Sequence, residues 1–160
     1  MLFGGRRAVA VEIERGGNVQ TLSATTEIIL STGAINTPKL LMLSGIGDCT
    51  HLERHGIPLV QNLPGVGENL QDHVSFGCSW ECREPLAPRN NGSEATLYWK
   101  SRPEMREPDL LFCQVEFPVP SDRTSARGIP AHGWTMFAGL ARPQSRGRVR
   151  LRKPCIGSGR

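Results

Sequence analysis

Alternating apolar and polar residues characterise the start of the chain. Between residues 8 and 14, Val9, Val11 and Ile13 fall on one face, and glutamates occupy the other. This period of two predicts a half-buried β-strand. The sequence Gly16-Gly17-Asn18 then favours a turn, so residues 19–24 are expected to return as the second strand of a hairpin.

A second pattern predicts a strand, a tight crossing and a helix. The short apolar run Glu27–Leu30 is typical of a buried strand. Four residues with small side chains follow at Ser31–Ala34, and their lack of bulk indicates that something must come close to this backbone. Thr37-Pro38 can cap and open a helix, so a helix is expected to begin there and to end by Gly45.

The pattern changes near His73. Before it, a short helix is expected over Cys49–His55, closed by Gly56. After it, apolar stretches separated by Pro-, Gly- and Arg-rich loops predict strands at residues 74–80, 96–99, 110–117, 134–140 and 148–152. A domain boundary near His73 would therefore separate a mixed helix and strand segment from a mainly antiparallel sheet.

The composition is that of a soluble, globular protein. Hydrophobic residues make up 38% of the chain and charged residues 21%, and no apolar run approaches the roughly 18 residues of a membrane span. The first residues do not resemble a signal peptide. Five cysteines, an odd number without regular spacing, favour reduced thiols and hence a cytoplasmic location.

Isolated motifs give only weak evidence of chemistry. The glycine clusters at residues 45–47 and 65–67 both lack the third glycine of a dinucleotide-binding loop. His51 and His55 would share one helix face, but no third ligand is evident, so an exposed polar face is favoured over a metal site. No metal is predicted.

Basic residues gather toward the end of the chain. The net charge is only +4, but six basic residues and no acidic ones lie between Arg142 and Lys153. Arg148, Arg150 and Arg152 would share one face of a strand, which could bind phosphates. A charged edge strand explains them more simply, because no aromatic residues are interleaved for base stacking. No nucleic-acid partner is predicted.

Taken together and in order, these segments resemble the glucose-methanol-choline (GMC) family of FAD-dependent alcohol oxidoreductases. The sequence EIILSTGAINTPKLLMLSGIG, residues 27–47, is similar to the family's second signature, and HGIPLVQNLPGVGENLQDH, residues 55–73, is similar to the stretch that follows it. Residues 6–12 resemble the preceding strand, while residues 108–110 and 142–151 resemble parts of the substrate domain. Of the family's branches, the choline dehydrogenase-like branch has the most similar sequence motifs.

The resemblance implies an α/β to α+β fold made of two partial domains. Residues 1–73 would form part of an FAD-binding domain without its N-terminal Gly-rich dinucleotide motif. Residues 74–160 would form part of an antiparallel-sheet, substrate-binding domain without the C-terminal catalytic segment. The chain is accordingly expected to be an internal fragment of a longer enzyme, with exposed sheet edges through which it could self-associate.

The implied activity is oxidation of the CH–OH group of a small-molecule alcohol, with hydride transfer to FAD. Ser31, Thr32, Gly33 and Ala34 would contact the flavin cofactor, and no catalytic residue is assigned in this chain. The isolated chain is therefore expected to be inactive. Two alternatives stay open: a non-catalytic module that binds through the basic segment, and a truncated product without a function of its own.

Overall fold

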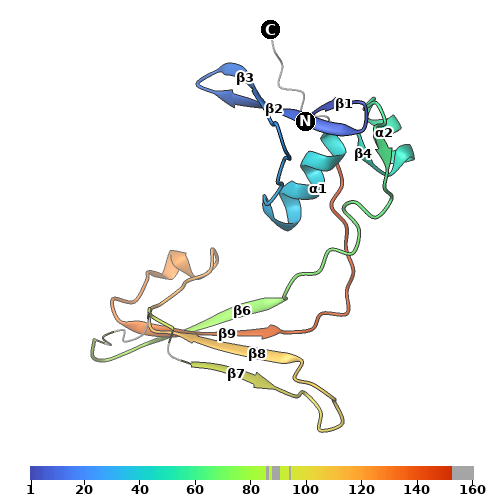
Figure 1. Cartoon of the computed structure of the whole chain (residues 1–160). Helices are drawn as coiled ribbons and strands as arrows, with labels where there is room; N and C mark the ends of the chain where they lie inside the picture. Colours follow the sequence, from blue (N-terminus) through green and yellow to red (C-terminus); the bar gives the residue numbers. More distant parts are fainter. Residues whose placement is uncertain (86, 88–90, 94, 153–160) are drawn as a thin grey trace. The chain divides into compact units, whose positions relative to one another are not determined.

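The computed structural model describes residues 1–85, 87, 91–93 and 95–152, and it divides into two compact units (Figure 1). The first contains Met1–Leu70 together with the segment that begins at Arg146, and the second contains Gln71–Ser145. The predicted boundary after residue 73 lies close to Leu70, where the first stretch of the first unit ends. The assignment of the two parts to a cofactor domain and a substrate domain stays a prediction.

The first unit opens with a three-stranded antiparallel sheet. It consists of β1 (Leu2–Gly4), β2 (Arg7–Arg15) and β3 (Asn18–Ser23), in that order. Strands β2 and β3 form the predicted hairpin, with Arg15 opposite Asn18 across the loop Gly16-Gly17. Both loop glycines have positive φ, which matches the twist of the flanking strands. The hairpin prediction is therefore confirmed.

The predicted buried strand over Glu27–Leu30 is wrong. These residues form no regular element, and Ile29 is 76% exposed. A strand exists only where its backbone groups pair with a neighbour. None of the described strands pairs with this segment, so its apolar side chains lack the sheet that would bury them.

Helix α1 (Gly33–Leu43) is longer than expected, and the prediction that it begins at Thr37-Pro38 is wrong. Thr32 occupies the N-cap, and Pro38 lies inside the helix as its sixth residue. The Thr37 hydroxyl accepts a hydrogen bond from the Thr32 backbone N–H at 3.2 Å, which ties the first turn back to its start. A proline near the helix start removes only one helical hydrogen bond, so the helix extends past it. Its end at Ser44 is as predicted.

A small core fixes the remaining elements of the first unit. Strands β4 (Ile46–Gly47) and β5 (Gln61–Asn62) pair in parallel, and α2 (Cys49–Arg54) lies between them in sequence, where a short helix was predicted. Met42 from α1, Leu52 from α2 and Leu151 form the buried cluster. The core therefore joins residues separated by about a hundred positions in the chain.

The second unit is an antiparallel sheet in the order β6-β9-β8-β7 (Figure 1). Its strands are β6 (Ser75–Glu81), β7 (Ala95–Trp99), β8 (Leu110–Val115) and β9 (Gly133–Leu140), and a short 3-10 helix η1 (Ser125–Arg127) lies between β8 and β9. All four strands were predicted, as was their antiparallel arrangement. Over the described part of the chain, no helix is both long and apolar enough to cross a membrane.

Candidate cofactor-binding segment

The four predicted site residues lie together at the start of α1. Ser31 and Thr32 precede the helix, Gly33 and Ala34 are its first residues, and all four are exposed. Gly33 has φ +85°, a conformation that favours glycine. A Cβ built on Gly33 would meet no described atom within 4 Å. The protein itself therefore leaves this backbone accessible to a ligand.

The backbone N–H groups of the first turn also lack a cap from their N-cap side chain. Thr32 makes no side-chain hydrogen bond to the helix backbone, and its hydroxyl instead lies 3.1 Å from the Thr37 hydroxyl. The first N–H groups of a helix have no partner within the helix, and they carry a partial positive charge. This turn therefore offers donors suited to a negatively charged or strongly polar group.

The opposite end of α1 is held tightly. Gly45 has φ +82°, and a Cβ there would lie 2.4 Å from the Pro58 carbonyl oxygen. The Gly45 carbonyl accepts hydrogen bonds from the backbone N–H groups of Val60 at 2.8 Å and Gln61 at 3.1 Å. This close approach positions β5 beside β4. The helix therefore has a fixed C-terminal end and an open N-terminal end.

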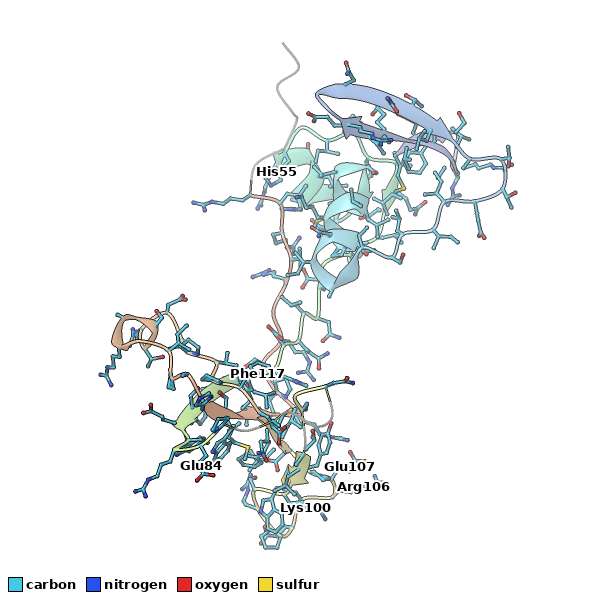
Figure 2. All side chains as sticks on the ribbon, turned by 90° about the vertical axis from the view of Figure 1, so that its left-hand side faces the viewer. His55, Glu84, Lys100, Arg106, Glu107 and Phe117 are labelled. Atoms are coloured by element: carbon cyan, nitrogen blue, oxygen red, sulfur yellow. The ribbon has the colours of Figure 1, made fainter. Side chains whose placement is uncertain are left out.

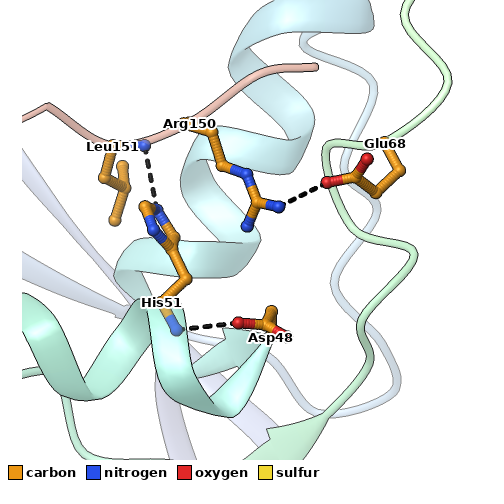
Figure 3. Close-up of polar contacts among 5 residues, drawn as sticks. All are labelled: Asp48, His51, Glu68, Arg150 and Leu151. Atoms are coloured by element: carbon orange, nitrogen blue, oxygen red, sulfur yellow. Dashed lines mark hydrogen bonds and ion pairs between the residues drawn. The ribbon is translucent and has the colours of Figure 1, made fainter. Parts of the chain in front are cut away.

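Polar contacts hold the segment that begins at Arg146 against the rest of the first unit (Figure 3). The Val149 N–H donates to the Gly67 carbonyl at 2.7 Å, and the Leu151 N–H donates to Nε2 of His51 at 3.2 Å. Arg150 pairs with Glu68 at 2.6 Å. These contacts bring the apolar side chains of Val149 and Leu151 to the Met42–Leu52 core.

His51 takes part in these polar contacts as a neutral imidazole, whose Nε2 accepts the hydrogen bond from Leu151. Asp48 caps α2 by accepting a hydrogen bond from the His51 backbone N–H at 2.8 Å. Burial lowers the pKa of the His51 side chain, and the positive charge of Arg150 lowers the pKa further. His51 contacts His55, the C-cap residue of α2, edge to face, with ring centroids 4.7 Å apart. In the described residues no three potential ligands gather for a metal ion.

The prediction of a strand over residues 148–152 is wrong, because these residues form no strand. The predicted alternation of arginines and apolar residues between two sides is confirmed. Only an isolated bridge joins Leu70 to Gly147, and no strand follows. Val149 and Leu151 turn toward the core while Arg148, Arg150 and Arg152 are exposed. The Val149 N–H donates to the carbonyl oxygen of Gly67, which lies in a turn. The pairing that begins between Leu70 and Gly147 therefore does not continue as a strand ladder.

Carboxylates neutralise part of the basic segment. Arg150 pairs with Glu68, and Arg142 pairs with Glu107. Lys39, Arg150 and Arg152, with aliphatic residues of α1 and of the C-terminal segment, line a groove of about 540 Å³ beside α1. Within the described residues, the pairing of Arg150 with Glu68 interrupts the row formed by Arg148, Arg150 and Arg152. The segment therefore offers little support for a phosphate-binding strand.

Several contacts that shape this region have no signal in the sequence. The parallel pairing of β4 with β5 involves only two residues on each strand. The bond from Leu151 to His51 spans 100 positions. Local periodicity cannot report such pairings, although the glycines at 45 and 67 mark two of the close approaches.

Comparison with known proteins identifies the chain's relatives. The sequence profile of the GMC oxidoreductase family matches residues 1–75. The chain is similar to the oxygen-dependent choline dehydrogenase of Brucella ovis, with 36% identity over 92% of this chain and 31% of the relative. The chain thus spans about a third of the length of the curated relatives that it matches.

Solved structures show the same relationship. The chain is similar to pyridoxine 4-oxidase from Mesorbium loti, with a TM-score of 0.71, 26% identity, and coverage of 97% of this chain and 31% of that one. A formate oxidase structure shares the fold, with a TM-score of 0.72, 23% identity and coverage of 94% and 35%. The mixed α/β to α+β fold predicted from the sequence is confirmed. The chain belongs to the GMC oxidoreductase family.

Proposed function

We propose that the chain is part of an FAD-dependent oxidoreductase that oxidises the CH–OH group of a small alcohol. The observation that carries this proposal is the similarity to choline dehydrogenase at 36% identity, which extends over 92% of the chain. A small-molecule alcohol of the choline type is the proposed substrate. Residues 1–73 contribute to the FAD-binding domain and residues 74–160 to the substrate-binding domain.

The proposed cofactor contact is the segment Ser31–Ala34. Its fit to a flavin rests on three features: solvent exposure of all four residues, open space where a side chain on Gly33 would lie, and first-turn N–H groups that the Thr32 side chain does not cap. A bulky side chain at Gly33 would fill the space that an aromatic ring system or its ribityl-phosphate chain needs. The fixed end at Gly45 keeps this segment in place.

When bound, FAD accepts a hydride from the alcohol carbon, and that redox chemistry belongs to the cofactor. The residues of this chain bind and orient. The first-turn N–H groups of α1 donate hydrogen bonds to polar groups of the ligand, while Gly33 permits close approach. No group in this chain is assigned as the base that takes the hydroxyl proton.

A cytoplasmic location completes the proposal. Cys49, Cys78, Cys82 and Cys113 are free thiols, and two of them are exposed. Free, exposed thiols are typical of a reducing compartment.

The test replaces Gly33 by valine in a full-length enzyme that carries this segment. The expected result is loss of bound flavin, measured as the visible absorbance of the purified protein relative to its absorbance at 280 nm. The physical reason is steric, since the valine side chain occupies the space of the cofactor. Overall folding should change much less than flavin content.

Gly56→Val is the matched control. Gly56 also has positive φ, at +65°, and also has no described atom within 4 Å of an added Cβ. The two substitutions therefore introduce similar backbone strain, but only one lies at the proposed cofactor contact. Equal flavin content in both variants would refute the assignment of Ser31–Ala34.

A further inference from the structure

The two helices of the first unit begin in different ways. At the start of α2, Asp48 has an extended backbone (φ −64°, ψ 120°), and its side chain accepts a hydrogen bond from the His51 N–H at 2.8 Å. This is the usual geometry of an N-cap residue. At the start of α1, Thr32 is not extended (φ −92°, ψ 15°), and its side chain caps no backbone N–H. Threonine favours the N-cap role, so a neighbouring group holds Thr32 in another conformation.

Thr37 supplies the contacts that hold Thr32. The Thr37 hydroxyl accepts a hydrogen bond from the Thr32 backbone N–H at 3.2 Å, and it lies 3.1 Å from the Thr32 hydroxyl. The first contact fixes the backbone of Thr32, and the second engages the oxygen that would otherwise cap the helix. One side chain, five residues further along the chain, therefore constrains both the backbone and the side chain of the N-cap residue.

Pro38 makes this side-chain contact more important. In an α-helix the N–H at position 38 would donate to the Ala34 carbonyl, four residues earlier, but proline has no N–H. The start of α1 is therefore held by one backbone hydrogen bond fewer than an ordinary helix. Because Thr37 directly precedes Pro38, its hydroxyl supplies part of the fastening that the backbone lacks.

A set of backbone donors stays open as a result. Thr32 donates its own N–H to Thr37, and the N–H groups of residues 33–35 have no partner within the helix. Over the described part of the chain, the Thr32 hydroxyl caps none of them. The peptide plane between Thr32 and Gly33 turns with ψ of Thr32, so the conformation of Thr32 also sets the direction of the Gly33 N–H.

We propose that Thr37 is a positioning residue of the cofactor-binding segment. Its hydroxyl holds Thr32 away from the first turn of α1 and thereby keeps the N–H groups of residues 33–35 available to polar groups of FAD. Thr37 acts through Thr32 rather than through a contact of its own with the ligand. The inference rests on the proposed function, because it takes Ser31–Ala34 as the cofactor contact.

The first test removes the Thr37 hydroxyl in the 160-residue chain without FAD. Valine is β-branched like threonine but neither donates nor accepts a hydrogen bond, so Thr37→Val releases both groups of Thr32. Thr32 should then become extended, as Asp48 is, and its hydroxyl should accept from the Ile35 N–H. Hydrogen exchange at the Ile35 amide should slow about fivefold, the protection expected from one N-cap hydrogen bond.

The second test measures FAD binding in a full-length enzyme that carries this segment. The FAD dissociation constant of Thr37→Val, from flavin fluorescence during titration of the apo-enzyme, should rise about fivefold, because the ligand must displace the new cap. Thr37→Ser keeps the hydroxyl and should bind FAD within about twofold of the wild type. The thermal midpoint of apo Thr37→Val should not fall, whereas a purely structural role of Thr37 would lower it.

A double variant identifies the blocking group. Thr32→Val combined with Thr37→Val removes the hydroxyl that caps the turn in the single variant. The double variant should therefore bind FAD more tightly than Thr37→Val alone. If Thr37 only stabilised the helix, the second substitution would add its own loss to the first. Recovery of affinity thus distinguishes positioning from simple stabilisation.

Thr50→Val is the matched control. Thr50 is an exposed threonine in the first turn of α2, the helix whose C-cap residue His55 is labelled in Figure 2. The substitution makes the same chemical change on a helix that is not proposed to contact the cofactor. The FAD dissociation constant and the exchange rate of the Ile35 amide should both stay at their wild-type values.

The outcomes separate this inference from the proposed function. If Gly33→Val loses flavin but Thr37→Val binds FAD as tightly as the wild type, the cofactor contact stands and the positioning role of Thr37 is wrong. If neither substitution changes flavin binding, the assignment of Ser31–Ala34 fails and the inference fails with it. Unchanged Ile35 exchange in Thr37→Val, or no recovery in the double variant, would show that Thr37 does not restrain the Thr32 hydroxyl.

Discussion

Gly33 and Gly45 lie at the two ends of α1, and the structure requires glycine at each for a different reason. Both have positive φ. Around Gly33 there is open space, whereas Gly45 is enclosed by Pro58 and Val60. Internal packing therefore explains Gly45 completely. At Gly33 it explains nothing beyond the backbone conformation, which is why a ligand contact is proposed there.

Gly45→Ala is expected to destabilise the first unit by about 2 kcal/mol or more, from left-handed backbone strain and overlap together. The overlap arises because the new methyl group would lie 2.4 Å from the Pro58 carbonyl oxygen. Gly56→Ala supplies the comparison, since its φ is +65° but its surroundings are empty. Gly56→Ala should lower the free energy of unfolding by only about 1 kcal/mol, because it introduces backbone strain without overlap. Urea unfolding would measure the free energy of unfolding of both variants. Equal decreases in the two would contradict the packing argument.

At the scale of elements, α2 and the C-terminal segment are coupled through His51. Leu151 donates to Nε2 of His51, and only an unprotonated nitrogen can accept. The groups that act on this imidazole are Arg150 from the C-terminal segment, Asp48 before α2, Arg54 at the end of α2 and His55 at its C-cap. Burial and the cations outweigh Asp48, so the pKa of His51 in the folded protein lies below the ordinary 6.5.

Acid should therefore loosen the C-terminal segment. Because the folded pKa of His51 is depressed, the stabilisation is complete above pH 6.5 and is lost as the pH falls through the folded pKa. Below it, the Leu151 bond is broken, which removes about 1 kcal/mol. Hydrogen exchange at the Leu151 amide should accelerate from pH 7.5 to pH 5, after correction for the intrinsic exchange rate.

Two glutamine variants separate His51 from general acid effects. His51→Gln keeps a hydrogen-bond acceptor but cannot titrate near neutral pH, so its Leu151 amide should stay protected in acid. His55→Gln leaves the bond intact, so acid should still loosen the segment, but at a higher pH than in the wild type because one group that lowers the pKa of His51 is removed. Acid sensitivity that persists in His51→Gln would assign the loosening to another group.

Elements that depend on neighbours in the sequence were predictable, and those that depend on distant partners were not. The β2–β3 hairpin follows from Gly16-Gly17 and the alternation before it. Helix α2 was predicted with Gly56 as its stop, and the structure adds Asp48 as its N-cap. Glu27–Leu30 has a strand-like composition but no strand beside it. The two-residue β4–β5 pairing is too short for any periodicity to show. The candidate site was located by resemblance and by small side chains, not by an arrangement of catalytic groups.

At the scale of the whole molecule, the chain's features divide by residue range. The family profile covers residues 1–75, where the proposed cofactor contact lies. The second unit supplies the four-stranded antiparallel sheet. The chain spans 31% of the choline dehydrogenase that it matches, so the complete reaction calls for groups beyond those assigned here.

The isolated chain of 160 residues is predicted to bind FAD weakly and not to oxidise alcohols. Its glycine clusters lack the pattern that holds a dinucleotide pyrophosphate at a helix N-terminus, and the open turn at Gly33 offers a single backbone contact region. No base is assigned, and general-base catalysis typically contributes about 10²–10⁴-fold in rate. The purified chain should therefore stay colourless after incubation with FAD and gel filtration. Assays with choline and with simple aliphatic and aryl alcohols, using an artificial electron acceptor, should show no turnover. A yellow protein that turns over any of these alcohols would show that the chemistry needs fewer groups than this assignment requires.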